Sequence, residues 1–356
     1  MGAIAVNNSE EDPRMVPSAP IALSGSPGSP YTRKMLAVLR YRRIPYRFLV
    51  GSQAAEQGLP QPKVRLLPTF YLPDETGDLQ AVTDSSPIIR RLERTFGARP
   101  LIPADPALAF LDSLIEDFGD EWLTKAMFHY RWVYGADIEK AAEVLPNWMG
   151  RPLDDEELST LGRAFAERQI GRLRYVGSNE ITKETIEASY KRLILLLDQH
   201  FSDLPFLLGA RPGAGDFGLF GQLTQLAAFD PTPMTLATEM APRVVAWTHA
   251  LEDLSGLEPS PGDWIDPAAP PATVKALLVE IGRVYAPLLL ANAKAVQTGA
   301  AEVAAEIDGR PWTQQAFPYQ AKCLAWLRAD YAALSPEAKA VVDAALKDTG
   351  CEALIG

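Results

Sequence analysis

The spacing of apolar residues changes character near residue 100. Before that point, short apolar runs alternate with amphipathic stretches, which predicts a β-α-β unit followed by a β-β-α unit over residues 19–99. The expected strands are 20–24, 46–51, 69–72 and 79–83, and the expected helices are 31–43 and one that begins at residue 84 or 85. This order predicts a small α/β domain.

From residue 104 onward the apolar positions follow the helical period. An all-helical domain is expected over 104–262, with helices at 106–134, 154–174, 182–201, 217–229 and 241–254 and a long loop region within 135–182. The Pro-rich stretch 259–271 is typical of a linker. Further helices at 273–299, 318–334 and 336–347 predict a helical extension over 272–356, and the polar residues 1–18 predict a flexible N-terminal arm.

The net charge of the chain limits the kinds of molecule that it is expected to bind. The chain has 34 Lys and Arg against 45 Asp and Glu, a formal charge of −11, which argues against binding to nucleic acid or an anionic membrane. The most apolar long stretch, 274–296, contains four charged residues, so no transmembrane helix is expected. The first residues lack the pattern of a signal peptide. A cytoplasmic location is therefore expected.

Cysteine and histidine are too few and too scattered for common metal or thiol chemistry. Cys323 and Cys351 are the two cysteines, and the three histidines are far apart in the sequence. No disulfide framework, CxxC motif or HxxxH spacing occurs, so we expect no metal site.

Three short motifs in the first domain carry possible chemistry. Ser29-Pro30-Tyr31-Thr32 follows the first predicted strand and opens the first predicted helix. Unpaired N–H groups and the helix dipole stabilise an anion at such a position, including a thiolate, to which a serine hydroxyl can donate. The alternative is that Ser29 only caps the helix.

The second motif is Leu67-Pro68-Thr69, directly before the third strand. A proline here, often cis, leaves the backbone of the preceding residue free to pair with an extended ligand. A simple strand-entry proline is the alternative.

The third motif is Asp84-Ser85-Ser86-Pro87-Ile88. Its serine hydroxyl and first-turn N–H groups could bind a carboxylate, while Asp84 could accept from an ammonium group, so together they suit an amino-acid head group. A helix-capping motif is the alternative.

Together the motifs resemble the glutathione transferase family, over roughly residues 19–260. SPGSPYTRKMLAVLRYRRIPY is similar to that family's first strand–helix unit, LLPTF to its cis-proline turn, and TDSSPII to its acidic-Ser motif. LLGARPGAGDFGLFGQL resembles its Gly-rich turn and buried Asp before a core helix. The resemblance implies a thioredoxin-like N-terminal domain and an all-helical C-terminal domain; the chain adds an extra helical tail.

The resemblance also implies roles for residues. A serine-type member would steady the glutathione thiolate through Ser29, with Ser24 and Ser26 as alternatives, for attack on a small apolar electrophile. Leu67 and Pro68 would pair with the cysteinyl backbone, and Asp84 and Ser85 would hold the γ-glutamyl end. The remaining assignments are Lys63 or Arg65 for the glycyl carboxylate, and Trp122, Phe128, His129 and Tyr130 for the acceptor pocket. Glutathione as co-substrate and a homodimer are further expectations.

Other functions stay open. A non-catalytic glutathione-binding or partner-binding member is one alternative, and a glutathione-dependent lyase, ether-cleaving enzyme or peroxidase is another. One departure from the family pattern is Gly213, where a Ser or Thr usually caps the core helix, a bond worth about 1 kcal/mol. The acidic residues Glu116, Asp117, Asp120 and Glu121 are expected to form a solvated face, with a carboxyl of raised pKa or a cation site as alternatives.

Overall fold

A four-stranded sheet and three helices form the N-terminal domain of the computed structural model, which describes residues 19–356. The elements are β1 (Ile21–Gly25), α1 (Pro30–Tyr41), β2 (Tyr46–Val50), α2 (Gln53–Glu56), β3 (Thr69–Pro73), β4 (Leu79–Val82) and α3 (Ser85–Thr95). The strand order is β2-β1-β3-β4, with β1 parallel to β2 and antiparallel to β3. The predicted β-α-β and β-β-α units are confirmed; the predicted arm, 1–18, lies outside the described residues.

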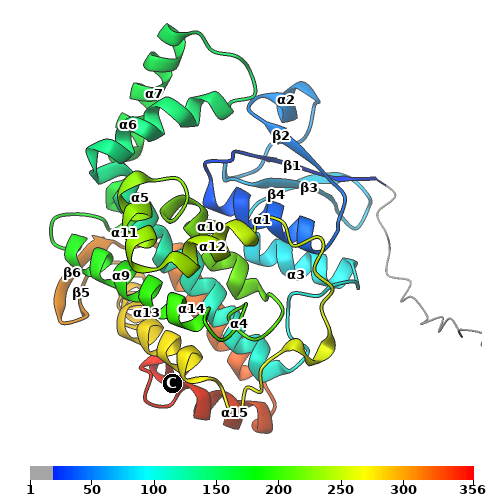
Figure 1. Ribbon diagram of the computed structural model, residues 1–356, viewed down its shortest axis with the longest axis vertical. Helices are drawn as coiled ribbons and strands as arrows, with labels where there is room; N and C mark the ends of the chain where they lie inside the picture. Colours follow the sequence, from blue (N-terminus) through cyan, green and yellow to red (C-terminus); the bar gives the residue numbers. More distant parts are fainter. Residues whose placement is uncertain (1–18) are drawn as a thin grey trace, which may run out of the picture.

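The two faces of the sheet are covered differently because side chains alternate along each strand. Leu23 and Phe70 point into the main core with α1 and α3, whereas Ala22 and Tyr71 pack against α2 on the other face. Figure 1 shows α1 and α3 between the sheet and the helical part of the molecule. The start of α1 and the start of α3 are thereby brought to the same side of the sheet.

Nine helices with a central, buried α10 make up the next part of the described chain. They are α4 (Pro106–Phe118), α5 (Thr124–Val133), α6 (Gly135–Val144), α7 (Asp155–Ile170), α8 (Leu173–Val176), α9 (Lys183–His200), α10 (Ala214–Leu226), α11 (Pro231–Met240) and α12 (Pro242–Ala250). The predicted all-helical domain is confirmed. The single helix expected at 106–134 is instead interrupted by a π-helical turn, Gly119–Leu123.

Within 135–182, the helix predicted at 154–174 is confirmed as α7, but the long loop expected before it is wrong, because α6 occupies 135–144 and the 3₁₀ turn Leu145–Trp148 follows. Helix α6 buries Ala141, which joins a small cluster with Trp132 and Ala166. Alanine gives a weak hydrophobic contrast along a helix, so the amphipathic pattern of α6 was hard to recognise. Helix α11 was also not predicted.

Helix α10 is capped from another helix. The Asp112 carboxylate of α4 accepts hydrogen bonds from the N–H groups of Ala214 (3.0 Å) and Gly215 (2.9 Å). A Cβ placed on Gly213 would lie 2.3 Å from Asp112 Oδ1, so Gly213 makes room for that carboxylate. The bond that a Ser or Thr at 213 would supply is therefore replaced by Asp112, from a helix distant in sequence.

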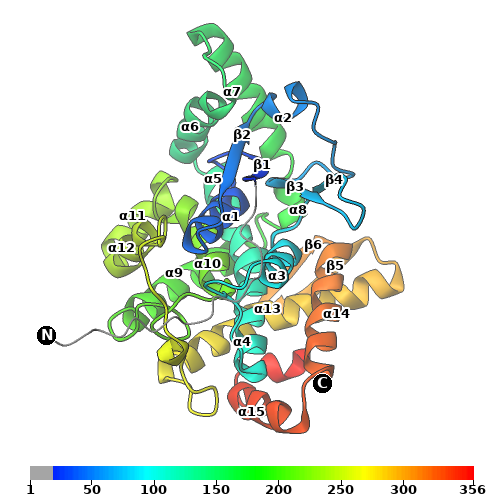
Figure 2. The same cartoon turned by 90° about the vertical axis from the view of Figure 1, so that its right-hand side faces the viewer.

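Three long helices of the C-terminal extension pack against the helical domain. They are α13 (Ala272–Thr298), α14 (Pro318–Ala332) and α15 (Pro336–Leu346), and they confirm the expected extra helices. A hairpin of β5 (Glu302–Ile307) and β6 (Arg310–Gln315) was not predicted, although its Asp308-Gly309 turn is a recognised hairpin signal. Figure 2 shows α14 beside α3 and α4.

The stretch 259–271 lies against the helical domain rather than apart from it. Ala210 N–H donates to the Asp263 carbonyl at 2.7 Å, and Ile265 N–H donates to the Leu208 carbonyl at 3.0 Å. These bonds join the Pro-rich connection to the loop before α10. Over residues 19–356, no helix has the length and apolar character needed to cross a bilayer.

Candidate functional site

The three motifs meet at one end of the four-stranded sheet. Ser24 of β1 pairs with Thr69 of β3, so Pro68 lies next to the turn that leads from β1 to Ser29. The Leu67–Pro68 peptide bond is cis. Lys34, in the second turn of α1, donates to the hydroxyl of Ser85, the first residue of α3, at 3.1 Å, which joins the two helices. Ser29, Pro68 and Asp84, which are 16 to 55 positions apart in the sequence, are thus gathered into one region.

Ser29 is the N-cap of α1. Its Oγ accepts a hydrogen bond from Thr32 N–H at 3.3 Å, and its own N–H donates to the Ser26 carbonyl at 2.9 Å. Because Oγ acts as an acceptor in this bond, its O–H can still donate to another group. A partly exposed hydroxyl at the positive end of a 12-residue helix suits an anion.

The turn before Ser29 is supported by the helical domain. Arg131 of α5 donates to the Gly28 carbonyl at 3.1 Å and is held by the Asp230 carboxylate at 2.8 and 2.9 Å. A Cβ on Gly28 would lie 2.4 Å from the Leu145 side chain, so this turn packs closely against the segment after α6. Burial raises the pKa of Asp230 to about 6, although Arg131 lowers it. Arg131 therefore contributes to the position of the Ser29 turn.

The loop before β3 is open to solvent. Leu67 is 45% exposed, and Lys63 and Arg65 are also exposed. The Thr69 hydroxyl donates to the Leu66 carbonyl at 2.9 Å, which fixes the chain on the far side of Pro68. An extended ligand could reach the backbone of Leu67 from solvent.

Asp84 immediately precedes α3 and has a positive φ of 84°. Its Oδ2 accepts a hydrogen bond from the Tyr319 hydroxyl of α14 at 2.7 Å. Burial raises the pKa of the Asp84 carboxyl, while the bond from Tyr319 and the charge of Lys34 lower it. The contact between Tyr319 and Asp84 was not predicted, because 235 residues separate the two positions.

Beneath this region lies a buried ionic cluster. Lys34 donates to Glu116 Oε1 at 2.7 Å and to Asp120 Oδ2 at 2.5 Å, and the Ser86 hydroxyl donates to Glu116 at 2.8 Å. Burial alone would lower the pKa of Lys34, but Asp120 and Glu116 raise it above its usual value. The two carboxylates stabilise a charged lysine inside the protein.

The expected solvated acidic face is therefore wrong. Glu116 and Asp120 are only 4% and 6% exposed. The reason is Lys34, which lies on the same face of α1 as Tyr31 and Val38 and so brings a counter-charge to the acidic helix. The sequence feature that could have indicated this buried ion pair is Lys34, a lysine among the apolar positions of the predicted helix 31–43.

Comparison with protein families agrees with this geometry. Residues 23–100 match the model of the glutathione S-transferase N-terminal domain, and residues 165–250 match that of the glutathione S-transferase C-terminal domain. The chain has the two-domain fold of the glutathione S-transferases. Both matched ranges end before α13, so the C-terminal extension lies outside them.

The solved structures to which the chain is similar are distant from it in sequence. The chain is 18% identical to a glutathione S-transferase from Methylobacterium radiotolerans JCM 2831 in complex with glutathione sulfonate, over 66% of this chain and 91% of that one, with a TM-score of 0.38. It is 17% identical to the beta-etherase LigF from Sphingobium sp. strain SYK-6, over 65% and 95%, with a TM-score of 0.45. No curated protein matches the chain.

The residues predicted to line the acceptor pocket lie on and around α5. Trp122 donates to the Ser189 hydroxyl at 2.8 Å, and its ring lies 5.3 Å from that of Trp312 in β6. His129 contacts the Ser178 hydroxyl at 2.8 Å, and burial lowers its pKa.

The other two members of this predicted set also contact aromatic rings. The Tyr130 ring packs 5.4 Å from that of Tyr190, and the partly buried Phe128 lies 6.3 Å from Trp132. A role for this set of aromatic residues and His129 in binding an acceptor remains a prediction.

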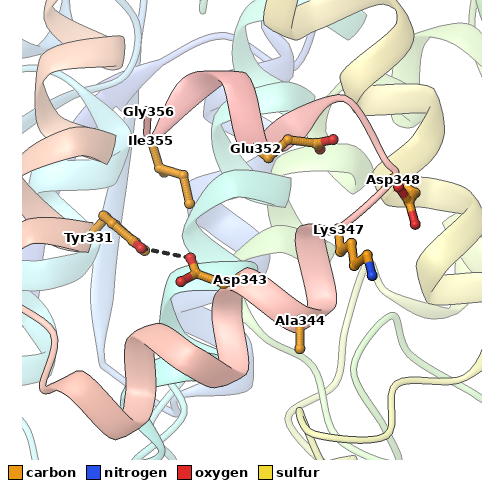
Figure 3. Close-up of a pocket in the computed structure, with 8 residues that line it drawn as sticks. All are labelled: Tyr331, Asp343, Ala344, Lys347, Asp348, Glu352, Ile355 and Gly356. Carbon is orange, nitrogen blue, oxygen red and sulfur yellow. Dashed lines mark hydrogen bonds between the residues drawn. The ribbon is translucent and has the colours of Figure 1, made fainter.

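A hollow of about 530 Å³ is found elsewhere, near the C-terminus (Figure 3). It is lined by residues of α14, α15 and the last turn, and the Tyr331 hydroxyl donates to Asp343 at 2.6 Å in its wall. None of the predicted site residues lines this hollow. Within residues 19–356, no group of three His, Cys, Asp or Glu side chains is placed to hold a metal ion.

Proposed function

We propose that the protein is a serine-type, glutathione-dependent transferase. The observation that carries this proposal is the convergence of the Ser29 turn, the cis Pro68 turn and Asp84 at one end of a glutathione S-transferase N-terminal domain. A hydroxyl donor at a helix N-terminus, an open backbone edge and a carboxylate are the three groups that a γ-glutamyl tripeptide thiol requires.

Each group has a distinct role in this proposal. The Ser29 hydroxyl donates to the glutathione sulfur and, with the N-terminus of α1, favours the thiolate. The thiolate sulfur then forms a bond to an electrophilic carbon, and the leaving group departs with its electron pair. The backbone of Leu67 pairs with the cysteinyl residue, and Lys63 or Arg65 meets the glycyl carboxylate.

The γ-glutamyl end is held at the start of α3. Asp84 accepts from the α-ammonium group, while N–H groups of the first turn face the α-carboxylate. The Ser85 hydroxyl accepts from Lys34 at 3.1 Å and donates to Asp120 Oδ2 at 3.4 Å, so its contribution to this site is assigned to its backbone N–H. An acceptor pocket at Trp122, Phe128, His129 and Tyr130, a homodimer and a cytoplasmic location belong to the same proposal.

Calorimetric titration with reduced glutathione at pH 7 tests this proposal. Wild-type protein should bind, and Asp84→Ala should weaken binding about tenfold or more, because a charge-assisted hydrogen bond is lost. Glu75→Ala removes an exposed carboxylate at the tip of the β3–β4 turn and serves as the control, with unchanged affinity expected. Absence of binding at millimolar glutathione would contradict the proposal.

A further inference from the structure

The C-terminal extension reaches directly into the proposed glutathione site. Tyr319, in the first turn of α14, donates its hydroxyl proton to Asp84 Oδ2 at 2.7 Å. Asp84 is the residue to which the proposed function assigns the ligand ammonium group. The extension lies outside both family matches, so this contact belongs to a part of the chain that the shared fold does not supply.

The position of Tyr319 is held on several sides. Asn292 of α13 is fully buried and bonds both backbone groups of Phe317, accepting from its N–H at 2.8 Å and donating to its carbonyl at 2.9 Å. The rings of Phe317 and Trp326 lie 6.1 and 6.0 Å from the Tyr319 ring. The next residue, Gln320, is buried and donates to Glu121 at 3.2 Å. These contacts hold the Tyr319 hydroxyl in one place.

The hydrogen bond from Tyr319 leaves the Asp84 carboxylate able to bind a ligand as well. An ionised carboxylate has about four acceptor positions, of which Tyr319 uses one. Asp84 is only partly buried, so solvent still reaches it. Lys34 of α1, Glu116 of α4 and Asp120 of the π-helical turn after α4 also act on this group, and the bond from Tyr319 lowers the pKa that burial raises. Tyr319 therefore favours the charged form, which binds an ammonium ion.

We propose that the C-terminal extension completes the glutathione site, with Tyr319 as a positioning residue that orients the Asp84 carboxylate toward the α-ammonium group of the ligand. The extension thereby makes the site selective for thiols that have a free γ-glutamyl amino group. This inference rests on the proposed function. The opposite possibility is that Tyr319 competes with the ligand for Asp84 and closes the site.

The test is calorimetry on the full-length protein with Tyr319→Phe, which removes one hydroxyl and keeps the ring. Two ligands are compared: reduced glutathione, and its desamino analogue, in which a glutaryl group replaces γ-glutamyl. Tyr319→Phe should weaken glutathione binding about three- to tenfold. Binding of the desamino analogue should stay the same as in wild type, because this analogue has no ammonium group to place. A loss of packing alone would weaken both ligands equally.

Tyr331→Phe is the matched control. Tyr331 is on the same helix and donates to an aspartate, Asp343, at 2.6 Å, but in the hollow near the C-terminus. This variant should bind both ligands as the wild type does. In an Asp84→Ala background, Tyr319→Phe should have no further effect, and thermal unfolding confirms that each variant is folded.

The outcomes separate the two proposals. Tighter glutathione binding by Tyr319→Phe would show competition and overturn the inference. Unchanged glutathione binding by Tyr319→Phe, or an equal loss of affinity for both ligands, would also overturn the inference. If Asp84→Ala still weakened glutathione binding in that case, the proposed function would stand. Failure of the wild type to bind glutathione would overturn the proposed function, and this inference with it.

Discussion

Ser29 combines a structural and a chemical role in one side chain. Its Oγ caps α1 by accepting from Thr32 N–H, and its O–H stays available as a donor. The cap contributes about 1 kcal/mol to stability, whereas the donor would act on the thiolate only. Experiments on variants of Ser29 must therefore distinguish a loss of protein stability from a loss of reaction rate.

Ser29→Ala should lower the rate of glutathione conjugation about tenfold or more, with little change in glutathione affinity. The rate should also need a higher pH, because the loss of a donor raises the pKa of the bound thiol. The measurement is kcat against pH with an activated aryl halide as electrophile. Ser29→Thr retains both the hydroxyl and the cap and should largely restore the rate.

Ser24→Ala and Ser26→Ala are measured in parallel. A rate lost in one of these variants and kept in Ser29→Ala would transfer the role to that residue. A normal rate in all three would exclude a serine hydroxyl from thiolate activation.

At the scale of elements, the start of α10 shows how helices share their caps. The N–H groups of Ala214 and Gly215 have no partner within their own helix, and the Asp112 carboxylate of α4 accepts from both. Asp112 is only 2% exposed, so its loss leaves buried donors without a partner. This cap joins α4 to the central helix of the fold.

Asp112→Ala should lower the free energy of unfolding by about 1–3 kcal/mol, measured by chemical denaturation. Asp105→Ala provides the comparison, because Asp105 caps its own helix, α4, through Ala107 and Leu108 N–H at 2.9 Å but is exposed. Its loss should cost about 1 kcal/mol or less, since water can replace the carboxylate. Equal effects of the two substitutions would contradict the assigned role of burial.

At the scale of the whole molecule, buried polar contacts join the extension to the helical domain. The Tyr285 hydroxyl of α13 donates to Asp117 Oδ2 of α4 at 2.6 Å. Burial raises the pKa of Asp117 to about 7, although the bond from Tyr285 and the nearby Cys323 thiol of α14 lower it. The docking of the extension is thus linked to a titratable group.

The raised pKa of Asp117 predicts the direction in which the stability of the folded protein changes with pH. In the unfolded chain an aspartate titrates near a pKa of about 4, so between about pH 4 and 7 the folded protein holds a proton that the unfolded chain has lost. The contribution of Asp117 to stability is present at low pH and is lost as the pH rises through about 7. In Asp117→Asn the side chain is neutral at every pH, so this variant does not lose stability in that way.

The free energy of unfolding of the wild type should therefore fall by about 1–3 kcal/mol relative to Asp117→Asn between pH 4.5 and 8. Denaturant titrations at several pH values measure this difference. Asp330→Asn, an exposed carboxylate on α14, should keep the wild-type slope. Parallel curves for wild type and Asp117→Asn would show that Asp117 does not titrate in this range.

Local patterns predicted much of the N-terminal domain. The apolar face of α1, the proline at its start and the short apolar runs of β1 and β3 depend on near neighbours in the chain, so they can be read without a structure. Pro68 and Asp84 were found for the same reason. The β5–β6 hairpin was missed because its strands are polar and rich in alanine, despite its Asp-Gly turn.

The sequence by itself determined most elements of the N-terminal domain, the family resemblance and the three motifs, because helix and strand periods, caps and turns are local properties. Only the tertiary structure decided which distant side chains meet. It brought Lys34 to Glu116 and Asp120, Asp112 to the start of α10, and Tyr319 to Asp84. Such contacts depend on how helices pack against each other. The apolar pattern along one helix shows which face is buried, but it does not show which other helix packs against that face.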